Sequence, residues 1–386
     1  MPLNNPITSA LLADPEIFQQ NRLPFHAHFA DQTSPEMPLA VSLDGEWAFH
    51  YAENLTAPFS DWDTLTVPGF IQMQSLQKPG QPYGTPHYVN TQYPWDGHEK
   101  LHPDQIPQDY NPIGEYQRSF TLPESWASCY LRLNGADSAA AVWCNDVYIG
   151  YTEDTFTPAE FDMTAAVHPG ENTLTVQVYR FSSGSWLEDQ DFWRMSGIER
   201  DVFLYSQPKA SVNDFRITST LDDTYKNGIF RLAIDLKNHQ TNTANLAVSY
   251  TLVDKDGKTV SESEQTVSVP SDKLSTVNFQ QQLPDVQTWT SEAPNLYKLF
   301  MTVKENGKVT EVIPYHVGFR RIEIKEIDQK AGNGKNYVVL LVNGQPIKLR
   351  GVNIHEHNPE TGHYVPEELM RKDFELMKRH NINTVR

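Results

Sequence analysis

The chain has 386 residues and a formal net charge of −18 at pH 7, a length that predicts two or three domains, each with its own core. The negative charge argues against nucleic acid or an anionic membrane as a partner, because like charges repel, whereas a neutral sugar is unaffected by this field. No apolar run reaches the roughly eighteen residues of a membrane span, and no basic and apolar secretory leader opens the sequence.

Between residues 43 and 205 the sequence breaks into short segments separated by Gly, Pro, Asn and Asp. Apolar residues alternate with more polar ones at 174–178, which is typical of strands in an all-β sandwich. Asn145 and Asp146, between two such segments, predict a tight hairpin turn. Residues 78–112 are rich in Pro, Gly, Tyr and His without any periodicity. A long irregular stretch of this kind is usually functional or disordered.

A second β region follows at residues 212–319. Apolar residues alternate at 230–236 and at 246–252, and Asp256 with Gly257 gives a turn signal. About seven short strands over about a hundred residues predict an immunoglobulin-like sandwich. This region has no cluster of acidic and aromatic residues, so we expect it to act as a spacer.

After Gly318 the pattern changes again. Residues 337–341 are rich in β-forming types, Asn343 and Gly344 predict a hairpin turn, and residues 347–353 predict another strand.

A helix is predicted to begin at Pro366, because proline and the acids after it favour a first helical turn. Met370, Phe374 and Met377 fall on one helical face. Residues 383–386 then resemble the beginning of a strand. Strand, helix and strand at this spacing predict one βαβ unit.

The segment LEDQDFWRMSGIERDV, residues 187–202, has the densest mixture of chemistry in the chain. Its acids Glu188, Asp189 and Asp191 fit a solvated acidic turn, or a site for sugar hydroxyls or a hard cation. Trp193 favours the sugar site, since the C–H face of a sugar ring stacks on aromatic planes while its hydroxyls bond to carboxylates.

This segment, with others in the same order, resembles the β-galactosidases of glycoside hydrolase family 2. The matching pieces are SLDGEW at 42–47, YVNTQYP at 88–94, NPIGEY at 111–116, GYTEDTFTPAEFD at 150–162, APNLY at 293–297, VGFR at 317–320 and RGVNIHEHNP at 350–359. The resemblance implies a mainly β chain in three parts. They are an N-terminal sugar-binding, jelly-roll-like β-sandwich at 1–207, an immunoglobulin-like β-sandwich at 208–320, and the start of an incomplete (β/α)₈ barrel at 321–386.

The resemblance implies that Asp191 bonds galactose hydroxyls and helps to hold a sodium ion, a role suited to a carboxylate oxygen. The alternative is an acid bonded to Arg194 or to backbone amides. Asn90 occupies the family position that contacts galactose, although its residue type alone would fit an ordinary turn. Thr91 fits a sugar contact or a local backbone turn.

His355 and His357, two residues apart, would share a face of a strand, so a metal pair is conceivable, but no third ligand of suitable spacing is evident. The resemblance assigns His355 to the sugar pocket, where its hydrogen bond would strengthen at the transition state. His357 is expected to support the pocket or the local structure. Trp193 and Trp95 fit either the wall of the sugar site or the core.

The resemblance implies hydrolysis of terminal β-galactosides such as lactose, by double displacement with retention. The acid/base and nucleophile glutamates and the Mg²⁺ ligands are expected beyond residue 386, so we expect this chain to supply the sugar-binding rim and to be inactive alone. A β-glucuronidase, which would need a basic group for the uronate, is one alternative. A non-catalytic carbohydrate-binding or complementation subunit of a split glycosidase is another.

The expected partners are a β-galactoside and, in the full-length protein, further copies of the chain, or a second chain if the enzyme is split. Cys129 and Cys144 are too few for a disulfide scaffold, so we expect free thiols in a reducing cytoplasm. A bond between these two cysteines is the alternative.

Overall fold

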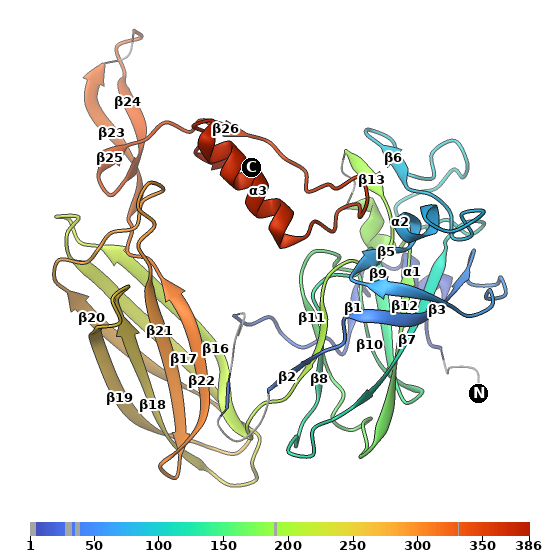
Figure 1. Cartoon of the computed structure of the whole chain (residues 1–386), viewed down its shortest axis with the longest axis horizontal. Helices are drawn as coiled ribbons and strands as arrows, with labels where there is room; N and C mark the ends of the chain where they lie inside the picture. The colour runs from blue at the N-terminus through green and yellow to red at the C-terminus, as the bar shows by residue number, and fades with distance from the viewer. Residues whose placement is uncertain (1–4, 28–32, 35–38, 189–190, 331) are drawn as a thin grey trace. The chain divides into compact units, whose positions relative to one another are not determined.

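The computed structural model describes residues 5–27, 33–34, 39–188, 191–330 and 332–386. The chain divides into two compact units (Figure 1). The first unit comprises Met1–Pro24, Ala40–Ser206 and Ile354–Glu375, and the second comprises Phe25–Leu39, Gln207–Asn353 and Leu376–Arg386.

Two antiparallel sheets form most of the first unit (Figure 1). Within the described residues, the larger sheet has seven strands in the order β1-β10-β9-β12-β7-β3-β4, and the smaller has four in the order β11-β8-β15-β2. These strands are β1 (Gln19–Gln20), β2 (Ala40–Ser42), β3 (Gly45–Ala52), β4 (Asp63–Val67), β7 (Ile113–Thr121), β8 (Tyr130–Leu133), β9 (Ala139–Cys144), β10 (Val147–Thr152), β11 (Ala159–Asp162), β12 (Glu171–Tyr179) and β15 (Val202–Tyr205).

Strand β9 is buried on both faces, and this shows how the core of the first unit is built. Successive residues of a strand point to opposite faces. One set of β9 residues joins an apolar cluster that also holds Trp47 of β3 and Leu131 of β8. The other set, which includes Trp143, joins a cluster with Ile7 and Leu12 of the N-terminal segment. The N-terminal residues therefore cover the outer face of the larger sheet.

Shorter elements complete the first unit, and two pairs of them form antiparallel ribbons, β5 with β14 and β6 with β13. They are α1 (Ser9–Ala13), β5 (Gly69–Phe70), α2 (Ile71–Leu76), β6 (His87–Val89), the 3₁₀ helix η1 (Ser183–Trp186), β13 (Phe192–Arg194) and β14 (Gly197–Ile198). The predicted hairpin turn is confirmed, since Asn145 and Asp146 join β9 to β10 with φ of 50° and 63°. Residues 78–112 are irregular, as predicted, apart from β6.

The second unit contains the predicted sandwich of seven strands, arranged as sheets β16-β17-β20 and β19-β18-β21-β22 in the part of the chain that the structure describes. The strands are β16 (Ala210–Leu221), β17 (Gly228–Asn238), β18 (Ala244–Val253), β19 (Thr259–Val269), β20 (Leu274–Leu283), β21 (Tyr297–Glu305) and β22 (Lys308–Val317). Both sheets contribute to one apolar cluster, to which β17 adds Phe230, Leu232 and Ile234. Asp256 and Gly257 form the predicted turn between β18 and β19.

Residues after 320 form a small antiparallel sheet and one parallel pair. The sheet consists of β23 (Ile322–Lys330), β24 (Asn336–Val342) and β25 (Gln345–Pro346), and the predicted turn at Asn343 and Gly344 joins the last two. Strand β26 (Gly351–Val352) pairs in parallel with β27 (Thr384–Val385), and helix α3 (Glu367–Arg379) lies between them in the sequence. This arrangement is the predicted βαβ unit.

The strand predicted over residues 347–353 is wrong in extent. Residues 347–350 lie outside any strand, and Gly351 and Val352 alone form β26. Pro346 ends β25, because proline has no N–H to donate to a sheet ladder. The helix prediction is confirmed, but no residue of α3 is buried, including the apolar face with Phe374.

The predicted fold class is confirmed: the chain is mainly β, with two sandwiches followed by the first strands and helix of a barrel. Among the described residues, no helix is long and apolar enough to cross a bilayer.

Cys129 and Cys144 are free thiols, each fully buried in the apolar cluster shared by the two sheets of the first unit. The alternative of a bond between them is therefore wrong. Burial raises the pKa of Cys129 to about 12 and that of Cys144 to about 11. Because the thiolate is the reactive form, we expect an aromatic disulfide reagent at pH 8 to label neither cysteine in the folded protein and both after unfolding. Rapid labelling of the native protein, read by mass, would contradict this burial.

Candidate functional site

The ribbon of β6 and β13 joins two motifs that lie far apart in the sequence. In its register Val89 faces Phe192, Tyr88 faces Trp193 and His87 faces Arg194. Asn90 follows β6 directly and Asp191 directly precedes β13, so both lie at the same end of the ribbon. Antiparallel pairing therefore explains why residues of YVNTQYP and LEDQDFW meet.

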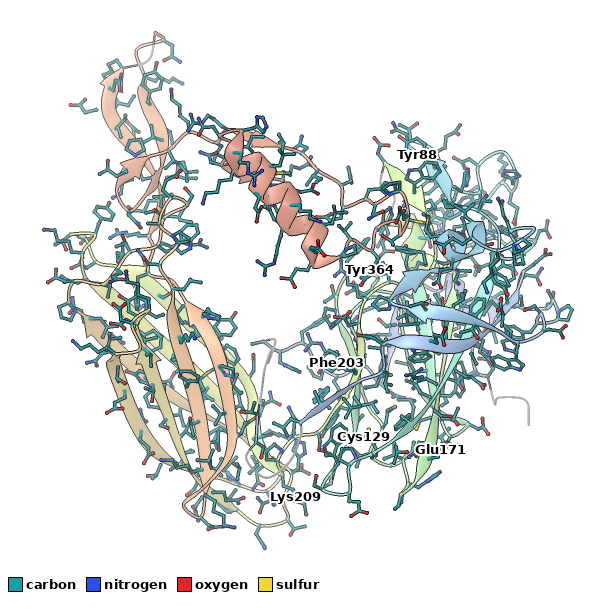
Figure 2. The ribbon with its side chains drawn as sticks, in the orientation of Figure 1. Tyr88, Cys129, Glu171, Phe203, Lys209 and Tyr364 are labelled. Carbon is teal, nitrogen blue, oxygen red and sulfur yellow. The ribbon has the colours of Figure 1, made fainter. Side chains whose placement is uncertain are left out.

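Tyr88, labelled in Figure 2, links the two predicted sugar-binding residues. Its hydroxyl donates a short hydrogen bond to Oδ1 of Asp191, and the side chain of Asn90 lies near the same hydroxyl. The hydrogen bond to the Asp191 carboxylate raises the pKa of Tyr88, while the Asn90 amide opposes this shift. The tyrosine ring lies 5.5 Å from that of Trp193, and both rings are partly exposed, at 47% and 40%. Exposed amide, carboxylate and aromatic groups thus lie together.

The segment after β26 brings histidines to this ribbon. The His357 ring lies 6.5 Å from that of Trp193 with an angle of 15° between the planes. The His363 ring lies 5.7 Å from that of His357. A glycine is needed at the adjacent turn, because Gly362 has φ of +75° and a Cβ there would lie 2.7 Å from Met195 Cε. Close packing on Met195 therefore fixes the segment beside β13.

The pKa of His363 is lowered to about 4, mainly by burial and to a smaller extent by the charges of His357, Arg194 and His355. His363 is therefore neutral at neutral pH. His355 is exposed and lies within electrostatic range of His363. His355 is connected to the site by its proximity to His363. Asn90 and Asp191 both lie at the Tyr88 hydroxyl.

Arg194 and Glu188 brace the chain on either side of Asp191. Nη1 of Arg194 donates to the backbone carbonyl of Glu188 at 2.6 Å. The Glu188 carboxylate accepts hydrogen bonds from Thr155, at 2.9 Å from Oγ1 and 3.3 Å from the backbone N–H. The described hydrogen bond to the Asp191 carboxylate comes from Tyr88. Asp189 lies outside the described residues.

Glu199 is a buried carboxyl group of the same unit, Asp137 and Glu188 are half-buried ones, and all have raised pKa values. Burial is the main cause in each case: it raises the pKa of Glu188 and of Glu199 to about 7 and that of Asp137 well above its usual range. The charges of Glu199 and Glu188 add to the shift at Asp137, and Arg194 opposes it. A hollow of about 30 Å³ lined by Asp137, Glu188, Arg180 and Arg194 has room for about one water.

A larger hollow, of about 640 Å³, lies in the second unit and is lined by residues that include Trp289, Tyr315 and Arg320. Among the described residues its lining has no carboxylate, so it lacks the chemistry of a glycosidase site. Within the same described ranges, no group of three or more His, Cys, Asp or Glu is arranged to hold a metal ion.

Trp95, considered for the sugar site, is only 3% exposed and belongs to the core. Its ring packs on those of Tyr93, Trp186 and Phe181, with centroids 5.1, 4.7 and 5.6 Å away. This packing anchors the irregular stretch that carries Asn90. The motif at 88–94 contains Tyr88, and His363 lies four residues after the motif at 350–359. No residue pattern singled them out, because their roles depend on contacts between distant segments.

Models of the glycosyl hydrolases family 2 match three consecutive stretches: the sugar binding domain at residues 40–208, the family 2 domain at 210–320 and the TIM barrel domain at 335–386. Among solved structures, the fold is similar to that of the β-glucuronidase from Bacteroides uniformis, with a TM-score of 0.72 at 20% identity over 92% of this chain and 39% of that chain.

The chain is also similar in sequence to curated β-galactosidases. It is 40% identical to that of Halalkalibacterium halodurans over 395 residues, which cover 97% of this chain and 36% of that protein. It is 39% identical to that of Priestia megaterium over 397 residues, which cover 97% of this chain and 37% of that protein. The chain thus spans little more than a third of the length of these relatives. Three consecutive family matches and these relatives together establish that the chain belongs to glycosyl hydrolases family 2.

Proposed function

We propose that the protein containing this chain is a β-galactosidase, which releases terminal β-galactose from substrates such as lactose with retention of configuration. The observation that carries the proposal is the meeting of Asn90 and Asp191 at the Tyr88 hydroxyl, beside the exposed ring of Trp193. An amide and a carboxylate can donate to and accept from neighbouring sugar hydroxyls while an aromatic ring covers a C–H face. The names of the curated relatives support the same substrate.

A neutral sugar fits this site better than a uronic acid. Asp191 would repel a uronate carboxylate, and the net charge of the chain is −18. The nearby arginines already bond to backbone carbonyls, Arg194 to that of Glu188 and Arg180 to that of Arg194. The likeness to a β-glucuronidase concerns the fold alone, at 20% identity.

The proposal includes a sodium ion at Asp191. The donor chemistry fits, because the carboxylate is exposed, Tyr88 binds one of its oxygens, and the Asn90 amide adds an oxygen nearby. A bound cation would offset the negative charge of Asp191 next to the sugar. His355 would donate a hydrogen bond to the sugar as charge develops at the transition state.

The proposal assigns sugar binding to this chain and places the two catalytic glutamates and the Mg²⁺ ligands outside its 386 residues. A retaining enzyme needs two carboxyl groups about 5 to 5.5 Å apart, and the three carboxyl groups with raised pKa values are bonded within the fold or enclosed by it. Assembly of several copies, or a second chain in a split enzyme, belongs to the same proposal. So does a cytoplasmic location, which the two free cysteines support.

The proposal is tested by the substrate preference of the complete protein. We expect kcat/KM for nitrophenyl β-galactoside to exceed that for nitrophenyl β-glucuronide by roughly a hundredfold or more, since Arg180 and Arg194 already bond to backbone carbonyls. Equal rates, or a preference for the glucuronide, would refute the assignment. Activity that arises only after addition of a second polypeptide would identify a split enzyme.

A further inference from the structure

We propose that Tyr88 is a positioning residue that fixes the direction of the Asp191 carboxylate, and thereby sets which sugar hydroxyl it binds. This inference rests on the proposed sugar-binding role of Asp191. It adds a residue that would act through Asp191 rather than on the reacting bond.

The register of the β6–β13 ribbon places four functional side chains on one face. Tyr88 and Asn90 are two residues apart in the sequence, as are Asp191 and Trp193 on the partner segment, and residues two apart share a face of a strand. The pairing ends at Val89 and Phe192, and one further step in the same register would set Asn90 opposite Asp191. The four side chains would then form a two-by-two grid, with Val89 buried on the other face.

Within this grid, Tyr88 contacts Asp191, the residue diagonally across the ribbon. Diagonal neighbours across a ribbon lie about 7–8 Å apart at their backbones, a span that a tyrosine side chain can bridge. Its hydroxyl donates a hydrogen bond to Oδ1 of Asp191. Contact with the Trp193 ring, 5.5 Å away at 57°, limits rotation of the phenol. One hydroxyl thus fixes an otherwise exposed carboxylate.

This arrangement leaves a defined set of hydrogen-bonding atoms for the sugar. A carboxylate accepts at both oxygens, and the bond from Tyr88 engages Oδ1, so Oδ2 of Asp191 is left for a sugar hydroxyl or a cation. A carboxylate has no proton to give, so the Tyr88 hydroxyl is the donor in this bond. Without this bond the carboxylate would rotate more freely and would lose conformational freedom on binding.

Tyr110 offers a matched control. It belongs to the same irregular stretch, is 42% exposed, and its hydroxyl lies 3.4 Å from that of Tyr51. Tyr88→Phe and Tyr110→Phe each remove one hydroxyl from a half-exposed ring. The first would free Asp191, whereas the second would free another tyrosine.

The experiment compares four variants of the complete protein, Tyr88→Phe, Tyr110→Phe, Asp191→Ala and the double variant Tyr88→Phe/Asp191→Ala, with nitrophenyl β-galactoside as substrate. We expect Tyr88→Phe to raise KM about tenfold, as for loss of a hydrogen bond to a charged group, with kcat within about twofold and an unchanged melting temperature. Tyr110→Phe should match the unmodified protein. Because Tyr88 acts through Asp191, the double variant should be no worse than Asp191→Ala alone.

Two outcomes would overturn the inference: kinetics of Tyr88→Phe equal to those of Tyr110→Phe, or independent, multiplying losses in the double variant. A sodium titration of Tyr88→Phe adds a second readout, in which we expect a weaker dependence on sodium than in the unmodified protein. If the unmodified protein instead prefers another glycoside, the proposed function fails. The same four variants measured on that glycoside then still decide the role of Tyr88.

Discussion

Replacing Asp191 by alanine is expected to lower kcat/KM for a β-galactoside by roughly a hundredfold or more. Each hydrogen bond to a charged group is worth about 1.5–3 kcal/mol, and Asp191 would lose its bonds to the sugar together with its attraction for a sodium ion. The side chain is exposed, so the folded structure should tolerate the change. Steady-state kinetics of the complete protein, at several sodium concentrations, measure the effect.

The control for this variant is Asp104→Ala, which removes an exposed acid from the irregular stretch of the same unit. Its kinetics should match those of the unmodified protein. Asp191→Asn should fall between the two, because the amide keeps one oxygen acceptor but loses the charge. Full activity of Asp191→Ala would refute the proposed role of Asp191 in sugar binding.

Replacing Glu199 by glutamine is expected to stabilise the protein above neutral pH by roughly 3 kcal/mol, the free energy that corresponds to its pKa shift. The Glu199 side chain is buried, and its Oε1 accepts no hydrogen bond. The nearest cation, Arg200, lies 4.0 Å from this oxygen and is half exposed. A charge in this position is poorly compensated, and burial raises the pKa of Glu199 from 4.5 to about 7.

The pH dependence of stability follows from the upward shift of the Glu199 pKa. Below about pH 4.5 Glu199 is protonated in both the folded and the unfolded chain, so it contributes no penalty. Between about 4.5 and 7 the unfolded chain binds fewer protons than the folded one, and the free energy of unfolding falls as the pH rises. Above about pH 7 the penalty is constant. Denaturant titrations at pH 4 and pH 8 should therefore show equal stability of Glu199→Gln and unmodified protein at pH 4 and a gain at pH 8.

Glu153 provides a matched comparison, because its replacement by glutamine is expected to lower stability rather than raise it. Burial also raises the pKa of Glu153, but its carboxylate accepts hydrogen bonds from Tyr151, Ser183 and the backbone N–H of Gly184. Glutamine cannot accept at both ends, so Glu153→Gln should destabilise the protein. A loss of stability in Glu199→Gln at pH 8 would contradict the account of that carboxyl group.

The sequence pattern predicted the strands and turns of the two sandwiches, because these elements depend on residues that are adjacent in the sequence. The alternation at residues 230–236 is that of a strand with one buried face, and Asn145 with Asp146 adopts the positive φ that a tight hairpin turn requires. The strand predicted at 347–353 was wrong in extent, because a run of apolar, β-forming residues does not show where pairing begins, and within this range only Gly351 and Val352 pair with β27. Burial of both faces of β9 also depends on the distant N-terminal segment.

The candidate site was predictable only in part. Asn90 and Asp191 were found because their motifs resemble those of a known family, and the structure brings them together at one hydroxyl. Tyr88 was not singled out, since its partner Asp191 is 103 residues away and the contact depends on the register of β6 and β13. The raised pKa of Glu188 likewise comes from burial that the fold creates.

Helix α3 and the parallel pair β26–β27 expose apolar side chains and strand edges to water. No residue of α3 is buried, and Phe374 and Leu376 are 55% and 54% exposed. Parallel strands occur almost always with both faces covered, and strand edges offer unpaired amides and carbonyls to other chains. A preparation limited to these 386 residues would therefore tend to self-associate through residues 335–386. Aggregation would then interfere with measurements of weak sugar binding. Ligand titrations should therefore use protein in which other residues cover that surface.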